Sequence, residues 1–305
     1  MRTIDYLFNP VYDGDYWPPV IATLLVALLA GPLSVLVVLK RLAFIGQGVS
    51  HSAFGGVGLA MLAAATGVGF FGASEGGRLL SPLAASIVVP GFALLSALAI
   101  SRLSRSSGLD AAIGVVLAVS MAIGVQAQSS AGRLALERGL ARPPSLERTL
   151  FGHVLEVGWF DVAASAAVAI AVGAALWWWR RPLLFWAFDA EGSRVRGVRG
   201  GRMRALLLGM LAIAVVVVMQ VAGVVLATAM LVLPGAAALR LGRTLGPVFL
   251  WSVVLSVLGA AAGVVIGFEL DLLLGPSIVA AQAVLLAIAM AAGVARGKMA
   301  RGRPR

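Results

Sequence analysis

The chain has 305 residues, of which 60% are hydrophobic and only 12% are charged, and its mean hydropathy is +0.99. Soluble proteins are about half apolar and about a quarter charged, so this composition excludes a soluble enzyme, a disordered chain and a fibrous protein, and leaves a polytopic membrane protein. The net charge of +11 comes from basic residues that lie between hydrophobic runs, so membrane topology explains this charge better than nucleic-acid binding does. The sequence has no cysteine, which excludes disulfides and thiolate sites.

Nine apolar runs, interrupted by glycine, proline and charged residues, predict the membrane spans. They cover residues 20–39, 49–66, 82–101, 109–128, 160–179, 205–221, 224–239, 247–268 and 276–294. The runs 49–66 and 224–239 are short and rich in small residues, so either is open to being a half-helix, and a count of eight stays open. We therefore expect an extracytoplasmic segment over 1–19, a membrane domain over 20–295 and a basic cytoplasmic tail over 296–305.

The basic residues predict the orientation of the chain in the membrane. Alternation of the nine spans places 18 of the 24 Lys and Arg residues on one side and 6 on the other. Cytoplasmic loops carry an excess of Lys and Arg, so we expect the C-terminus in the cytoplasm and the N-terminus outside the plasma membrane. The first 19 residues are acidic and aromatic, which does not fit a cleaved signal peptide.

Two polar residues stand out near the start of the second apolar run. Gln47 and His51 are four residues apart and so share one face of a helix, among glycines that let neighbouring helices approach closely. Two interpretations stay open: a histidine hydrogen-bonded across a helix interface, or a cation ligand or gate residue, because imidazole binds Zn, Cu, Fe and Ni. With His153 as the other histidine, a histidine-based metal site has at most two imidazoles per chain.

Three acidic residues near span ends are further candidates for the transport pathway. Asp110 opens the fourth span, where stabilisation of a helix N-terminus is the plain interpretation. Glu269 and Asp271 lie between the last two spans, on the outer side, where they are either carboxylate ligands or ordinary loop acids. Composition alone does not choose between these roles.

Two other segments have two interpretations each. Residues 129–158 form an outer loop of about 30 residues, which is either a linker or a surface that meets a partner. Gly259, Gly263 and Gly267 form a small-residue stripe that packs a helix closely, within the chain or between two copies.

The longest inner loop, 180–204, combines aromatic residues, an acidic pair and seven arginines. It is either an interfacial anchor that faces anionic lipid or a docking loop for a cytoplasmic partner. Asp189-Ala-Glu191 is typical of a short helix start, because acidic residues favour the first turn. The chain has no GxxxxGK[ST] motif and so is not itself a P-loop ATPase. Because no catalytic arrangement has a supporting context, we expect a non-catalytic protein.

Six segments, in order and spacing, resemble the ABC-3 family of membrane permeases from zinc, manganese and iron importers. The resemblance covers roughly residues 20–294. The segments are residues 31–60 with the Gln47 and His51 region, Leu109–Gly114, Leu150–Gly152, Phe188–Val198, Leu231–Leu241 and Asp271–Val279.

The resemblance implies an all-helical fold of eight to nine spans, similar to the vitamin B12 importer (type II ABC importer). It implies a homodimer of permease subunits embedded in membrane lipid. The partners it implies are two cytoplasmic P-loop ATPase subunits, which bind ATP, and an extracytoplasmic substrate-binding protein. It implies no nucleic acid partner and no tightly bound cofactor, only a transported metal cation, with His51 as the metal ligand in the chain. The pathway or gate residues it implies are Gln47, His51, Asp110, Glu269 and Asp271, and the ATPase-coupling residues are Phe188, Asp189, Glu191, Arg194, Arg196 and Gly197.

The sequence departs from the family pattern at three positions. Gln47 stands where the family has aspartate, and Gly55 and Leu273 stand where it has proline. A neutral amide is a weaker ligand for a hard or borderline cation than a carboxylate. A permease of the same fold for a non-metal or chelated cargo is therefore a second hypothesis. A secondary transporter without an ATPase is a third, but it predicts more intramembrane charges than this sequence has.

Overall fold

The computed structural model describes residues 3, 16–66, 82–104, 106, 108–139 and 157–301, and every regular element in these ranges is an α-helix. The contacts divide the chain into two compact units. The first unit comprises Met1–Ala43, Phe151–Ala190 and Val217–Arg305, and the second comprises Phe44–Leu150 and Glu191–Val216. Three features of the sequence analysis lie outside the described residues. They are the Leu150–Gly152 motif, His153 and the predicted N-terminal segment, of which only Thr3 and the residues from 16 onward are described.

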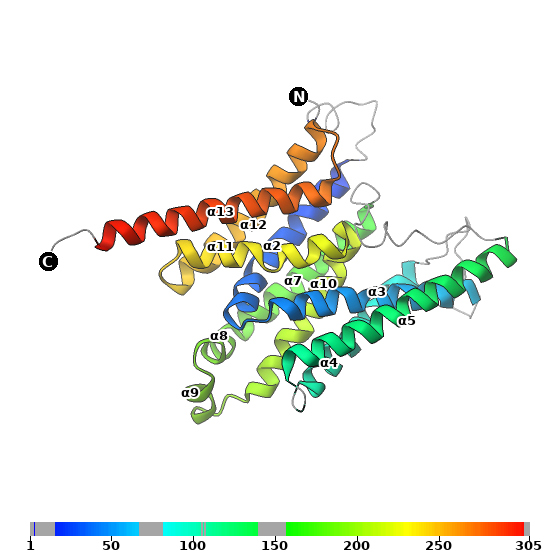
Figure 1. The fold of residues 1–305 in the computed structure, drawn as a ribbon, viewed down its shortest axis with the longest axis horizontal. Helices are drawn as coiled ribbons and strands as arrows, with labels where there is room; N and C mark the ends of the chain where they lie inside the picture. The colour runs from blue at the N-terminus through cyan, green and yellow to red at the C-terminus, as the bar shows by residue number, and fades with distance from the viewer. Residues whose placement is uncertain are drawn as a thin grey trace. The chain divides into compact units, whose positions relative to one another are not determined.

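Seven helices in the described ranges are long and apolar enough to cross a membrane. Two shorter apolar helical stretches, Ile87–Leu103 and Leu226–Leu241, bring the total close to the predicted eight or nine. The helices are α2 (Trp17–Leu39), α3 (Ala43–Thr66), α4 (Pro82–Leu103), α5 (Leu109–Glu137), α7 (Trp159–Trp178), α10 (Gly200–Met230), α11 (Leu233–Leu241), α12 (Leu245–Glu269) and α13 (Leu274–Arg301) (Figure 1). The all-helical polytopic fold is thus confirmed.

Some predicted boundaries differ from the structure. The run at 49–66 belongs to one helix of 24 residues, not a half-helix. The predicted break between 205–221 and 224–239 is confirmed, because Gly223 has a non-helical conformation (φ 80°, ψ 168°) and separates two helical stretches within α10. Glycine adopts this conformation without steric cost. The run 224–239 is itself interrupted at 231–232, between α10 and α11. The start of the predicted outer loop, 129–137, is the last part of α5, and α13 continues through most of the predicted tail.

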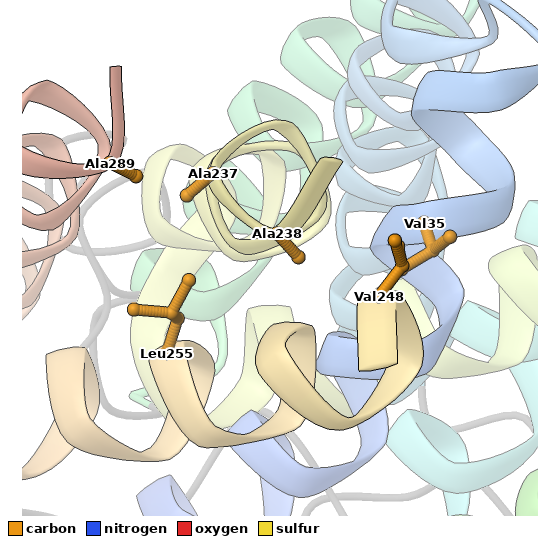
Figure 2. Close-up of a cluster of buried hydrophobic side chains, with 6 residues drawn as sticks. All are labelled: Val35, Ala237, Ala238, Val248, Leu255 and Ala289. Carbon is orange, nitrogen blue, oxygen red and sulfur yellow. The ribbon is translucent and has the colours of Figure 1, made fainter. Parts of the chain in front are cut away.

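In the first unit, α2 packs against α7, α11 and α12, and α12 packs against α11 and α13. Gly31 makes the crossing of α2 and α12 tight, since a Cβ there would lie 2.9 Å from Val253 Cα. Ser256 Oγ donates a 2.7 Å hydrogen bond to the Ala27 carbonyl oxygen at the same crossing. Figure 2 shows the adjoining buried cluster, which joins α2, α11, α12 and α13 through Val35, Ala237, Ala238, Val248, Leu255 and Ala289.

The glycine stripe on α12 packs against α13 within the chain. A Cβ at Gly259 would lie 2.6 Å from Gln282 Cγ, and one at Gly263 would meet the backbone of Ile278. Gly267 is buried in the same way. Gln282 is 2% exposed, and neither atom of its amide has a hydrogen-bond partner among the described residues. Close packing, not an amide hydrogen bond, therefore holds this helix pair together.

In the second unit, α3 and α5 run side by side in the same direction (Figure 1). A Cβ at Gly48 would lie 2.7 Å from Ile113 Cγ2, and ten residues further along α3 a Cβ at Gly58 would meet the backbone of Gly124. Arg138 Nη1 then donates a 2.8 Å hydrogen bond to the Ala65 carbonyl oxygen at the far end of α3. These contacts fix the register of the two helices over most of their length.

Candidate transport site

The polar pair Gln47 and His51 lies on one face of α3. Gln47 is exposed, His51 is partly buried, and Phe44, one turn before Gln47, is 66% exposed. Gly55 follows His51 by one helical turn and so lies on the same face, which packs against α5: a Cβ at Gly55 would lie 2.7 Å from the Ser120 carbonyl oxygen, and one at Gly58 would meet the backbone of Gly124. The two polar side chains thus share the face of α3 that approaches α5, as their spacing predicted, and Gln47 lies at its exposed end.

The serines that flank His51 belong to the packed side of α3. Ser50 and Ser52 are fully buried. Ser52 Oγ donates a 2.9 Å hydrogen bond to the Val49 carbonyl oxygen in the same helix. A serine bonded back to its own helix satisfies its hydroxyl locally. Ser52 is therefore a structural residue, whereas no hydrogen bond within α3 assigns such a role to the imidazole of His51 or the amide of Gln47 among the described contacts.

Asp110 lies in the same unit as the polar pair, one helical turn before Ile113, the residue that packs on Gly48. It is exposed, in the first turn of α5, and Gly108 (φ 80°) is the N-cap residue. A carboxylate in the first turn is favoured by the helix dipole. The structure thus brings Asp110 to the same end of the α3–α5 pair as Gln47 and gives it a structural role there as well.

The other two acidic candidates belong to the first unit, at the turn between α12 and α13. Glu269 Oε1 accepts hydrogen bonds from the backbone nitrogen of Thr3 (3.1 Å) and from its Oγ1 (2.8 Å). Asp271 is exposed and has φ 52°, and the next residue, Leu272, donates a 2.9 Å backbone hydrogen bond to the carbonyl oxygen of Gly267. This geometry is a left-handed cap at the end of α12, and aspartate tolerates it better than most residues.

The five candidate pathway residues therefore fall into two groups, one in each unit. Among the residues that the structure describes, no group of three or more His, Cys, Asp or Glu side chains could hold a metal ion. His51 has Gln47 as its neighbour on α3, but no second nitrogen or carboxylate completes a ligand set there. The described part of one chain therefore contains no closed metal site.

The predicted docking loop begins with two short helices, α8 (Arg180–Phe188) and α9 (Ala190–Val195). The inner side of α8 is anchored, because Leu183 and Trp186 are buried. Lys40, just after α2, places its Nζ 4.2 Å from the centroid of the Trp186 ring. This cation–π contact ties α8 to the end of α2. No local pattern in the sequence pairs these two residues, so the contact was not predicted.

Most of the rest of the loop is exposed, although Ser193 is fully buried. Phe188 is 55% exposed, and the other coupling candidates also lie on the surface: Asp189, Glu191, Arg194, Arg196 and Gly197. Glu191 is in the first turn of α9, as predicted. Gly197 has φ 81° and closes α9 in a Schellman cap, in which its N–H bonds to the Arg194 carbonyl oxygen and Val198 N–H to that of Ser193. The anchored helix α8 is thus followed by a mostly exposed tip, Phe188–Gly197, which ends in this cap.

Comparison with known proteins gives one consistent answer. Residues 17–293 match the model of the ABC 3 transport family. The chain is 28% identical, over 94% of its length and 97% of the relative, to a probable iron transport system membrane protein of Haemophilus influenzae. It is 34% identical, over 84% of its length and 82% of the relative, to a probable metal transport system membrane protein of Thermotoga maritima. The solved structure of PsaBC from Streptococcus pneumoniae in complex with Fab aligns with a TM-score of 0.74 at 25% identity, covering 94% of this chain and 93% of that one.

Proposed function

Because the chain belongs to the ABC 3 transport family, we propose that it is the membrane permease subunit of an importer. The proposed cargo is a divalent metal cation (zinc, manganese or iron), which the importer moves across the plasma membrane. The family model spans nearly all of the described helices, which agrees with the resemblance found in the sequence. One observation carries the choice of cargo: α3, a membrane-spanning helix, holds an imidazole and an amide one turn apart on one face. Polar groups in a span are costly and mark transport pathways.

We place Gln47 and His51 along the pathway, with Asp110 near them and with Glu269 and Asp271 at the outer entrance. Because the described part of one chain has no group of three ligands, a cation held in the membrane needs ligands from elsewhere. A homodimer supplies a second His51 and a second Gln47. Imidazole nitrogen suits zinc and iron, and water completes the shell of a cation that passes through without resting.

The energy for transport comes, in this proposal, from two cytoplasmic ATPase subunits that bind ATP and dock on the tip formed by Phe188–Gly197. Their closure and opening drives the dimer between outward-open and inward-open states, and an extracytoplasmic binding protein delivers the cation. The excess of Lys and Arg on one side supports a cytoplasmic position for this tip and the C-terminus. The Lys40–Trp186 contact supports a coupling role, since it connects α8 mechanically to the end of a transmembrane helix.

A permease of the same fold for a chelated or non-metal cargo is the second candidate, and Gln47 is the observation that favours it. An amide lacks the charge that attracts a bare divalent cation. The test is uptake of radioactive zinc, manganese and iron, each as the free ion and as a chelate, by cells that produce the chain with its ATPase. Uptake of the free ion that stops when the ATPase is inactivated supports the first candidate, whereas uptake of the chelate alone supports the second.

Asp271→Gly removes one carboxylate without disturbing the cap, because glycine adopts φ 52° freely. We expect the KM for metal uptake to rise about five-fold, since an exposed charge near the cation path contributes about 1 kcal/mol in water, while kcat stays unchanged. Initial rates over a range of metal concentrations measure this. Asp271→Asn keeps the shape and serves as the matched variant. An unchanged KM in both variants would leave Asp271 as a helix cap only.

Gly197→Val is expected to abolish docking of the ATPase. Valine at φ 81° costs about 2 kcal/mol, so the cap of α9 is lost and recovery of the ATPase with the purified permease falls roughly ten-fold or more. Gly197→Asn is the control, because asparagine accepts the left-handed cap position and should retain the ATPase. Equal recovery with both variants would place the docking surface elsewhere on the chain.

A further inference from the structure

An apolar groove runs along the first unit between α2, α7 and α12, and the function proposed above does not use it. It has two stretches, of about 310 Å³ and about 440 Å³, which share Pro32, Gly173 and Leu176 and so are continuous. We propose that this groove binds one anionic phospholipid, with an acyl chain along the groove and the phosphate at Arg180. The inference rests on the membrane location of the chain and not on its cargo.

The length of the groove matches one leaflet of a bilayer. Its lining residues extend on α7 from Ala166 to Trp177 and on α2 from Leu25 to Leu36. Each stretch is about 17 Å long at the rise of 1.5 Å per residue of an α-helix. The hydrocarbon of one leaflet is about 15 Å thick, half of the bilayer core. An acyl chain that starts at the mouth of the groove therefore reaches its end near the bilayer midplane.

The groove is empty space that hydrocarbon can fill. Gly173 lines both stretches, and a Cβ built on it meets no atom within 4 Å; the same holds for Gly246 at the mouth. Ile170 is 72% exposed and Leu28 is 48% exposed along its length. All the lining residues are apolar except Arg180. A lining of this kind excludes a polar solute and favours an acyl chain.

The mouth of the groove favours a negatively charged headgroup. The guanidinium carbon of Arg180 lies 3.8 Å from the centroid of the Trp177 ring, which holds this side chain beside the groove. Arg181 follows it, and Arg243, also exposed, stands two residues before the lining residue Leu245. The first turn of α8 contains no acidic residue, so the positive end of the helix dipole adds to the two arginines there.

This arrangement fits an anionic phospholipid better than a second copy of the chain. A protein surface that covered the groove would bury Arg180 and Arg181 and would need carboxylates to pair with them. A phosphate at the membrane surface pairs with arginine directly. Tryptophans such as Trp177 and Trp178, 68% and 79% exposed, are typical of the level at which lipid headgroups lie.

The test is native mass spectrometry of the purified full chain with added phosphatidylglycerol or phosphatidylcholine of the same acyl composition. We expect one tightly held phosphatidylglycerol per chain, and weaker retention of phosphatidylcholine. Arg180→Gln should lower phosphatidylglycerol retention about five-fold, the contribution of one basic residue at a lipid surface, and lower phosphatidylcholine retention less, because the choline cation offsets the charge of its phosphate. Gly173→Leu should lower retention of both lipids because the side chain occupies the groove.

Two matched variants serve as controls. Gly209→Leu places the same side chain over another open glycine, on α10, and Arg133→Gln removes an exposed arginine from α5. Both should retain lipid as the wild-type chain does. Equal retention of the two lipids by the wild-type chain, or equal loss with Arg133→Gln and Arg180→Gln, would overturn the assignment of an anionic lipid.

A second measurement covers the case in which Gly173→Leu does not fold. Photoactivatable phosphatidylglycerol with a diazirine on its acyl chain should label residues 25–36 and 166–177 of the wild-type chain above all other segments. Uniform labelling of the helices would contradict the proposal. The sequence has no cysteine, so Ile170→Cys introduces a single thiol in the groove. Disulfide formation between two copies in membranes would show that protein, not lipid, covers this surface.

Discussion

Replacing His51 by alanine is expected to abolish metal accumulation, with a loss of at least about 100-fold in the uptake rate, while the protein still assembles in the membrane. Changes in the groups that merely orient a metal ligand cost about 10–100-fold, and loss of a ligand costs more. The partly buried imidazole lies one helical turn before Gly55, on the face of α3 that packs against α5. Alanine adds no atom to this interface, so the two helices still pack together. Metal content of starved cells, measured after addition of zinc, manganese or iron, reports the effect.

Ser52→Ala is the matched control for the His51 variant. Ser52 is the next residue in the same helix, but it is fully buried and its hydroxyl is bonded to the Val49 carbonyl oxygen. We expect normal uptake. Wild-type uptake by an assembled His51→Ala variant would remove the histidine from the pathway. If the wild-type chain itself changes no metal content under starvation, the proposed metal cargo is wrong, and the cargo of the binding protein becomes the next question.

Gln47→Asp extends the same experiment in the opposite direction. A carboxylate oxygen is a better ligand for a divalent cation than an amide oxygen. In the same uptake assay we expect the half-saturating concentration of the free cation to fall, with the largest gain for manganese, the hardest of the three cations. A variant that gains the free cation but loses a chelated one would identify Gln47 as the residue that sets the form of the cargo.

Much of the fold was predictable from the sequence because membrane spans are set by hydrophobicity and length. The helices α2, α7, α12 and α13 begin within a few residues of their predicted starts. Residues 129–137 were misassigned because their small and polar side chains resemble a loop, whereas in the structure they continue α5, and Arg138 just beyond them binds the end of α3. The break between 205–221 and 224–239 was predictable, because glycine adopts non-helical conformations without steric cost and Gly223 does so there.

The candidate site was predictable only in part. The shared face of Gln47 and His51 follows from helical spacing alone. The left-handed conformation of Asp271 does not, because it is fixed by the cap that ends α12. The contact between Lys40 and Trp186 joins residues far apart in the chain, and only the packing of α8 against α2 brings them together. Local pattern therefore indicates candidate residues, but only the folded contacts show which structural roles those residues also have.

Gly124→Val should both destabilise the protein and stop uptake, although Gly124 carries no chemistry. A Cβ at this position would lie 2.7 Å from Cδ1 of Phe54, which is 1% exposed and has no room to move, and 3.0 Å from Gly55 Cα. Overpacking of this kind costs about 3 kcal/mol, and the strain is relieved only if α3 moves away from α5. His51 is on α3, about one turn from Gly55, so its position in the pathway shifts with the helix.

Gly114→Val on the same helix separates this effect from a general cost of valine in α5. Gly114 is exposed, and a Cβ there meets no atom within 4 Å, so we expect nearly normal stability and normal uptake. Thermal unfolding in detergent, together with uptake per folded molecule, compares the two variants. Equal unfolding temperatures would mean that the α3–α5 crossing tolerates a side chain. A loss confined to Gly124→Val would show that the spacing of these two helices, and not only the ligands on them, determines whether the cation passes.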